Sequence, residues 1–168
     1  PNRFTDGYGP NESVYKYFIE QEGISLIITV DNGVAGNEAI AYAQEQGVDV
    51  IVTDHHSMPS QLPEAYAIVH PEHPGADYPF KYLAGCGVAF KIATALLETI
   101  PTEMLDLVAI GTIADMVSLT DENRIMVKVG LEILKTTERI GLQELLRISE
   151  VDLTTISEET VAFKIAPQ

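Results

Sequence analysis

One stretch of the sequence decides the fold: Ile51-Val52-Thr53-Asp54-His55-His56. It continues a largely β-branched apolar run, residues 48–52, that follows a glycine and is typical of a buried strand in a parallel sheet. One carboxylate and two adjacent imidazoles come directly after this run. Side chains just past the C-terminal end of such a strand line the crevice where open α/β sheets bind ligands. The stretch therefore predicts a strand that delivers reactive side chains to one point.

The residue types after the strand favour a metal site. Neutral imidazole and carboxylate together suit divalent Mn, Zn or Fe, and a carboxylate beside a ligating histidine commonly fixes the tautomer of that histidine. The alternative is a polar loop whose two histidines are solvated. The six residues by themselves leave both interpretations open.

A second strand with a carboxylate at its end strengthens the metal interpretation. Residues 25–30 form another apolar run, which ends in Asp31-Asn32-Gly33. Residues 36–46 have the spacing of an amphipathic helix and are followed by a glycine. The three segments predict a βαβ unit, whose right-handed crossover puts both strand ends on one rim of the sheet. We therefore expect Asp31 and His55 to approach each other.

Four ordered stretches resemble the successive motifs of the DHH phosphoesterase family. In their order and spacing they are similar to the RecJ-type members, which are single-strand-specific 5′→3′ DNA exonucleases. The resemblance extends over the whole chain, because residues 1–9 also resemble that group's arginine and Gly-Tyr-Gly motif. The four stretches are Thr29–Gly33, Asp54–His56, Gly85–Lys91 and Ala114–Leu119.

The resemblance implies a reaction and a set of site residues. Asp31 would bridge two Mn²⁺ or Mg²⁺ ions, and His55 and Asp115 would hold one of them. Asp54 would orient His55, and His56 would donate a hydrogen bond to the scissile phosphate. The implied reaction is in-line hydrolysis of phosphodiester bonds in single-stranded DNA. It releases 5′-nucleotides and serves DNA repair and recombination.

Four further residues are candidates for binding the substrate. Arg3 would supply a forked donor to a phosphate and Tyr8 a stacking face for a base, although a frayed terminus is the plain alternative. Gly85 and Gly87 open a predicted helix, where they permit close backbone approach and where free N–H groups can face an anion. Tight packing of that helix is the competing explanation.

Asp115 ends a segment, residues 104–113, that is apolar almost all round and predicts a buried helix. An unpaired buried carboxylate costs several kcal/mol, and the negative end of a helix adds to this cost. A cation beside Asp115 would resolve both problems. The alternative is that Asp115 simply faces water.

The whole chain is predicted to be an α/β protein, a parallel sheet of βαβ units flanked by helices. We expect a partial DHH-type domain over residues 1–119 and a helical extension over residues 120–168. A helix after Asn11 should bury an aromatic stripe that includes Tyr15 and Phe18. Apolar spacing at Ile125, Val129 and Ile133 predicts a helix in the extension. Residues 65–69 predict a short strand, and His70 and His73 after it are expected to be solvated loop residues.

The charge of the chain argues against a nucleic-acid partner. The formal net charge is −15, with only 10 lysines and arginines, whereas phosphate binding normally relies on clustered basic residues. Bound cations, or basic segments outside these residues, would weaken the objection. The single Cys86 and the lack of an apolar run of ~20 residues fit a cytoplasmic protein without a membrane partner.

One element of the family's metal site is missing from the sequence. DHH enzymes carry an Asp-x-Asp motif upstream, and these 168 residues contain no two aspartates spaced by one residue. Two-metal phosphoryl chemistry needs enough carboxylates to hold both ions ~3.5–4 Å apart. We therefore expect an internal piece of a larger enzyme that is inactive by itself. Its partners would be single-stranded DNA and proteins of replication or repair.

Two other functions remain open within the resemblance. The first is a small-substrate phosphoesterase that acts on oligonucleotides, cyclic dinucleotides or pyrophosphate. The second is a non-catalytic RecJ-like scaffold, against which the presence of Asp31, Asp54, His55 and Asp115 speaks. Substrate length preference separates the first alternative from the exonuclease.

Overall fold

The computed structural model describes residues 4, 7 and 9–167, and the chain divides into two compact units. The first unit ends at residue 81 and the second begins at residue 82. Among the described residues, no helix is both long and apolar enough to cross a membrane. The parallel sheet lies in the first unit, so the predicted α/β class is confirmed.

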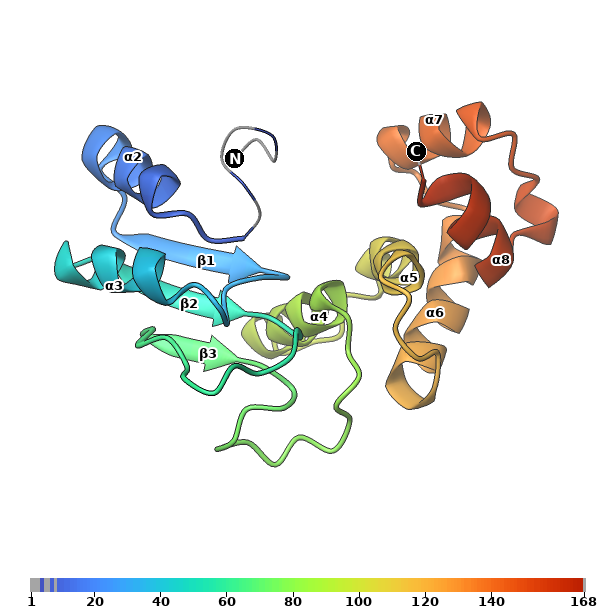
Figure 1. The fold of residues 1–168 in the computed structure, drawn as a ribbon. Helices are drawn as coiled ribbons and strands as arrows, with labels where there is room; N and C mark the ends of the chain where they lie inside the picture. Colours follow the sequence, from blue (N-terminus) through green and yellow to red (C-terminus); the bar gives the residue numbers. More distant parts are fainter. Residues whose placement is uncertain (1–3, 5–6, 8, 168) are drawn as a thin grey trace. The chain divides into compact units, whose positions relative to one another are not determined.

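The sheet of the first unit has three parallel strands in the order β1-β2-β3 (Figure 1). They are β1 (Leu26–Val30), β2 (Asp49–Thr53) and β3 (Ala67–Val69). Helix α3 (Asn37–Glu45) connects β1 to β2, so the predicted βαβ unit is confirmed. Because all three strands run the same way, their C-terminal ends share one edge of the sheet. Any side chain that follows a strand directly is therefore placed at this edge.

Helix α2 (Glu12–Glu22) begins as its sequence predicts. The side chain of Asn11 accepts a hydrogen bond from the N–H of Ser13, and the helix stops at Gly23, whose φ of 63° is left-handed. Helices α2 and α3 form one core with the inward side chains of the sheet. Its buried members are Tyr15, Val34, Ala39, Ile40, Ala43, Val48, Val50 and Val52.

The predicted aromatic stripe of α2 is wrong for one of its members. Tyr15 is buried, but Phe18 is 41 % exposed. The ring of Phe18 instead contacts the neighbouring Tyr17 edge to face, with ring centroids 5.5 Å apart. Apolar spacing identified the helix correctly, but it did not show how much of the stripe the sheet covers.

The second unit is helical throughout its regular elements. Helix α4 (Gly85–Leu97) is followed by a 3₁₀ turn (Thr102–Met104), α5 (Leu105–Ala114) and α6 (Asp121–Leu134). The remaining elements are α7 (Ile140–Ile148), a 3₁₀ turn (Leu153–Thr155), α8 (Glu158–Thr160) and a π-helical turn (Val161–Ile165). The predicted helical character of residues 120–168 is confirmed.

Helices α5 and α6 pack closely because of one glycine. A Cβ atom at Gly130 would lie 2.1 Å from the carbonyl oxygen of Leu105. This approach determines which side of α6 is buried, and it is not the side that carries Ile125 and Val129, which are 63 % and 41 % exposed. The buried side carries Met126, Val127, Leu131 and Leu134. The predicted domain boundary at residue 119 falls between these two helices and stays a prediction.

Candidate metal centre

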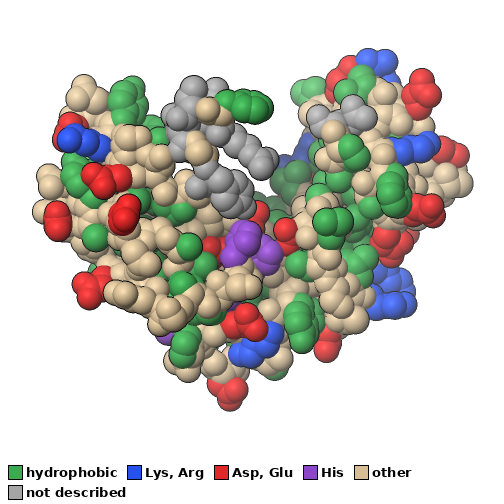
Figure 2. All heavy atoms as spheres, in the orientation of Figure 1, with side chains coloured by type: hydrophobic (Ala, Val, Ile, Leu, Met, Phe, Trp, Pro, Cys, Tyr) green, Lys and Arg blue, Asp and Glu red, His purple; other side chains and the backbone are tan. Residues whose placement is uncertain are grey.

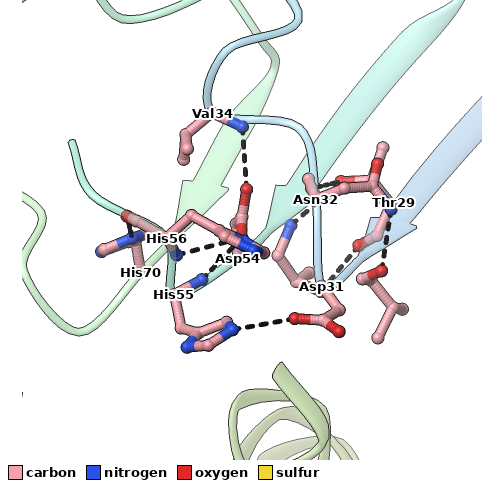
Figure 3. A network of polar contacts seen from close by, with 10 residues as sticks. Thr29, Asp31, Asn32, Val34, Asp54, His55, His56 and His70 are labelled. Atoms are coloured by element: carbon pink, nitrogen blue, oxygen red, sulfur yellow. Dashed lines mark hydrogen bonds and ion pairs between the residues drawn. The ribbon is translucent and has the colours of Figure 1, made fainter. Parts of the chain in front are cut away.

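Polar side chains follow each of the three strands and meet at the C-terminal edge of the sheet (Figure 3). Asp31 comes directly after β1, and Asp54, His55 and His56 come directly after β2. His70 comes directly after β3. The site is therefore built from three loops that the parallel sheet brings together.

The loop after β1 holds Asp31 in an unusual conformation. Its φ is 64°, in the left-handed region that aspartate tolerates better than most residues. The N–H of Asp31 donates to the carbonyl of Thr53 at 2.9 Å, and the hydroxyl of Thr29 donates to the carbonyl of Asn32 at 2.7 Å. These bonds tie the loop to β1 and β2. The two hydrogen bonds thus stabilise the strained backbone conformation of Asp31.

The expected approach of Asp31 and His55 is present. Nε2 of His55 lies 2.9 Å from Oδ1 of Asp31 (Figure 3). The side chain of His55 is 11 % exposed, and that of Asp31 is 52 % exposed, so the pair opens to solvent on the aspartate side. A cation or a charged substrate can therefore reach the carboxylate.

Asp31, His55 and His56 form a donor set that fits a divalent cation. One potential ligand atom from each residue lies within 4.8 Å of the other two. A carboxylate oxygen and imidazole nitrogens are ligands that Mn²⁺ accepts readily. The geometry therefore suits one divalent ion.

Asp54 organises the loop after β2 from below the surface. It is 1 % exposed, and its carboxylate accepts hydrogen bonds from the main-chain N–H groups of Val34 (3.0 Å), His55 (2.8 Å) and His56 (3.2 Å). Burial would raise the pKa of this carboxyl, but these bonds and one from the His56 ring outweigh burial and hold the pKa below its usual value. Asp54 is therefore a buried anion in the folded protein.

The ring that Asp54 contacts is that of His56 and not, as the sequence resemblance implied, that of His55. Nδ1 of His56 lies 2.6 Å from Oδ1 of Asp54, and Asp54 reaches His55 through the main-chain N–H. The chain bends after Asp54, so the ring two residues on turns back to the carboxylate. Because a carboxylate only accepts, Nδ1 of His56 carries the proton, and Nε2 holds the lone pair of the neutral ring.

Asp115, another predicted metal ligand, is not in the same unit as Asp31 and His55. Asp115 is the residue directly after α5 and is exposed. It belongs to the second unit, so its approach to Asp31 stays a prediction.

Gly85 and Gly87 lie in the first turn of α4 and are buried. A Cβ atom at Gly87 would lie 3.3 Å from the side chain of Leu83, which supports a packing role. Arg3 and Tyr8 lie outside the described residues.

The prediction for His70 is wrong. His70 was expected to be a solvated loop residue, but it is 4 % exposed and both ring nitrogens are hydrogen-bonded to main chain. Nε2 lies 2.8 Å from the carbonyl oxygen of His56 (Figure 3). The available signal was its position, because His70 follows a strand as directly as Asp31 and Asp54 do.

The chain has a large excess of acidic residues, with a formal net charge of −15. Figure 2 shows acidic side chains scattered over the displayed face and histidine side chains that reach the surface. The side chain of His56 is 43 % exposed. Such a surface attracts cations and repels a polyanion, so any binding of DNA needs neutralisation of the carboxylates at the site.

Comparisons with known proteins identify relatives of the whole chain. A single-stranded-DNA-specific exonuclease RecJ of Bacillus subtilis is 55 % identical over 168 residues, which are 100 % of this chain and 21 % of that protein. The RecJ of Thermus thermophilus is 39 % identical and is covered to 25 %. The chain thus spans between a fifth and a third of the length of such curated relatives.

Solved structures show the same fold. A crystal structure of exonuclease RecJ bound to manganese superposes with a TM-score of 0.87 at 36 % identity, covering 99 % of this chain and 42 % of that one. RecJ of Thermus thermophilus in complex with Mn²⁺ gives a TM-score of 0.77 at 35 % identity, covering 91 % and 24 %. The family model described as DHH family, N-terminal domain, matches residues 3–112. With its Asp-His-His loop at the end of β2, the chain belongs to the DHH family.

Proposed function

We propose that this chain supplies part of the catalytic domain of a 5′→3′ exonuclease specific for single-stranded DNA and dependent on Mn²⁺ or Mg²⁺. The observation that carries the proposal is the meeting of Asp31, His55 and His56 at one edge of the sheet. The similarity to RecJ exonucleases over the full length of the chain supports the choice of substrate.

In this proposal, Asp31 and His55 hold a divalent cation, and Asp115 of the second unit adds a further carboxylate. Bound divalent ions neutralise phosphate charge and lower the pKa of water, which makes an attacking oxygen available at neutral pH. Asp31, which is half-exposed, would also be a ligand of a second ion. The residues present are too few for two complete ion sites, and the remaining ligands would come from an Asp-x-Asp motif.

His56 acts on the substrate and Asp54 acts on His56. The hydrogen bond to Asp54 fixes the ring so that Nε2 points away from the carboxylate, and it stabilises the protonated ring. A protonated His56 donates from Nε2 to an oxygen of the scissile phosphate and stabilises the charge that develops there. The buried, ionised Asp54 is suited to this task because its own hydrogen bonds keep it charged.

The substrate and the cellular setting follow from the same proposal. Arg3, Tyr8 and the first turn of α4 with Gly85 and Gly87 would contact the strand. The acidic surface is tolerated because the bound cations face the phosphates. DNA repair and recombination in the cytoplasm, with replication or repair proteins as partners, is the proposed setting.

The test is a chimera in which these 168 residues replace the matching fifth of Bacillus subtilis RecJ. We expect Mn²⁺-dependent release of mononucleotides from a 5′-phosphorylated single strand, and its loss in the His55→Ala chimera. His73→Ala is the matched control and should retain activity, because the ring of His73 accepts a hydrogen bond from the N–H of Gly75 within its own turn.

Three results of the same assay would contradict the proposal. Preference for dinucleotides over long strands would indicate a small-substrate phosphoesterase. No activity in a folded chimera would indicate a non-catalytic scaffold. Full activity after His55→Ala would remove the metal assignment. The 168-residue chain by itself is expected to be inactive and serves as the baseline.

A further inference from the structure

The hydrogen bonds of His70 determine its protonation state. The N–H of Glu72 donates to Nδ1 at 3.0 Å, so Nδ1 carries a lone pair. The carbonyl oxygen of His56 only accepts, so the proton of His70 is on Nε2, 2.8 Å away. Buried His70 is therefore a neutral ring in a single tautomer that links the loop after β3 to the loop after β2.

This hydrogen bond reaches His56, the residue that is proposed to contact the substrate. His56 is held by Asp54 at two points, its N–H and its ring Nδ1. Its carbonyl is the third point and is held by His70. The N–H of Asp54 donates to the carbonyl oxygen of Val69 at 3.2 Å. After Asp54, residues 55 and 56 are not paired with a strand. Side chains therefore determine the direction of the His56 ring.

We infer that His70 is a positioning residue of the metal centre: its Nε2–H group fixes the main chain of His56 and thereby the ring of His56 against Asp54. This inference rests on the proposed function for its catalytic consequence. It assigns to His70 no contact with the cation or the substrate. Partners that orient site residues in this way commonly change metal affinity or activity 10–100-fold when they are removed.

The competing explanation is that His70 only stabilises its own turn. The bond from Glu72 to Nδ1 is of that kind, and His73 makes the same bond with the N–H of Gly75 at 3.1 Å. His73 is therefore a matched control within the same loop. A role confined to the turn predicts similar effects of replacing either histidine, whereas a positioning role predicts an effect at His70 that is different in kind.

Three variants separate the two explanations. His70→Leu removes both bonds, and His73→Leu removes the turn bond of the control. His70→Gln restores a donor, because the glutamine amide nitrogen lies about as far from Cβ as Nε2 of histidine does. The first readout is the two-bond ¹H–¹⁵N spectrum of the metal-free 168-residue chain. It should show His70 protonated at Nε2 and His56 protonated at Nδ1.

We expect His70→Leu to shift or broaden the ring signals of His56, His70→Gln to restore them, and His73→Leu to leave them unchanged. In the RecJ chimera, His70→Leu should lower the rate of mononucleotide release at saturating Mn²⁺ about 10-fold, with recovery in His70→Gln. Unchanged His56 signals and an unchanged rate in a folded His70→Leu variant would overturn the inference.

Two further outcomes are also decisive. If His70→Leu does not fold, His70→Gln must show the parent's His56 signals, and altered signals in a folded His70→Gln variant would overturn the inference. If the unaltered chimera is inactive, the proposed function fails, but the His56 spectrum still tests whether His70 positions that ring.

Discussion

Two carboxylates are each 1 % exposed, Asp54 in the first unit and Asp106 in the second, and they are satisfied in different ways. Asp106 accepts from Nε of Arg139 at 3.1 Å, from the hydroxyl of Thr137 at 2.8 Å and from the N–H of Leu107 at 2.7 Å. Its charge is thus balanced by a guanidinium. Asp54 is surrounded by main-chain N–H groups and one imidazole.

The difference distinguishes a carboxylate with a structural role, Asp106, from one whose charge can act on a site residue, Asp54. A guanidinium that pairs with Asp106 fastens the start of α5 to the segment before α7 and neutralises the charge where it stands. Dipoles stabilise the charge of Asp54 without cancelling it. The remaining negative charge acts on the ring of His56, and through the site on any cation nearby. Burial alone would not have distinguished the two.

Removing the arginine side chain that pairs with Asp106 should have the largest effect on stability. Arg139→Ala leaves the buried Asp106 unpaired, which we expect to cost about 3 kcal/mol in the free energy of unfolding of the second unit. Urea denaturation of the 168-residue chain, followed by circular dichroism, measures this change. Arg147→Ala is the control, because the exposed pair with Glu144 contributes ~0.2–1 kcal/mol. Equal losses in the two variants would show that Asp106 does not depend on Arg139.

Asp54→Asn should mainly affect activity. The amide oxygen can still accept from the N–H groups of His55 and His56, but the bond from the N–H of Val34 and the charge that orients and stabilises the His56 ring are lost. We expect a 10–100-fold decrease in the exonuclease activity of the RecJ chimera, with a smaller change in stability than in Arg139→Ala. The paired variant Asp106→Asn should show the opposite pattern, a loss of stability with activity retained. Loss of activity in Asp106→Asn alone would reverse the comparison.

Part of the fold and of the site could be predicted from the sequence. The strands and the helix of the βαβ unit follow from apolar spacing, and the meeting of Asp31 with His55 follows from parallel strand ends. The ring that faces Asp54 could not be predicted, because the bend after β2 decides which of two adjacent histidines turns back. His70 was missed because a single histidine after a short strand has no periodicity that indicates burial.

A smaller effect is expected in the loop that carries Asp31. Gly33 has a φ of 123°, and a Cβ atom there would lie 2.7 Å from Oγ1 of Thr29 and 2.9 Å from a methyl group of Val52. Gly33→Ala should cost about 1–3 kcal/mol through the strained backbone, with weaker Mn²⁺ binding as Asp31 shifts. Gly47→Ala also has a positive φ but meets nothing within 4 Å, so it controls for backbone strain alone. A Gly33→Ala variant no less stable than Gly47→Ala would argue against close packing at this loop.

The central claim, that Asp31 and His55 bind a divalent cation beside His56, is tested most directly by Mn²⁺-induced line broadening in the ¹H–¹⁵N spectrum of the 168-residue chain. Paramagnetic Mn²⁺ broadens nearby amide signals, so it locates the ion even when binding is weak. We expect broadening at low Mn²⁺ to centre on residues 31–33 and 54–56 and to disappear from them in His55→Ala. Broadening that centres on the acidic helix α2, or that is unchanged in His55→Ala, would contradict the claim.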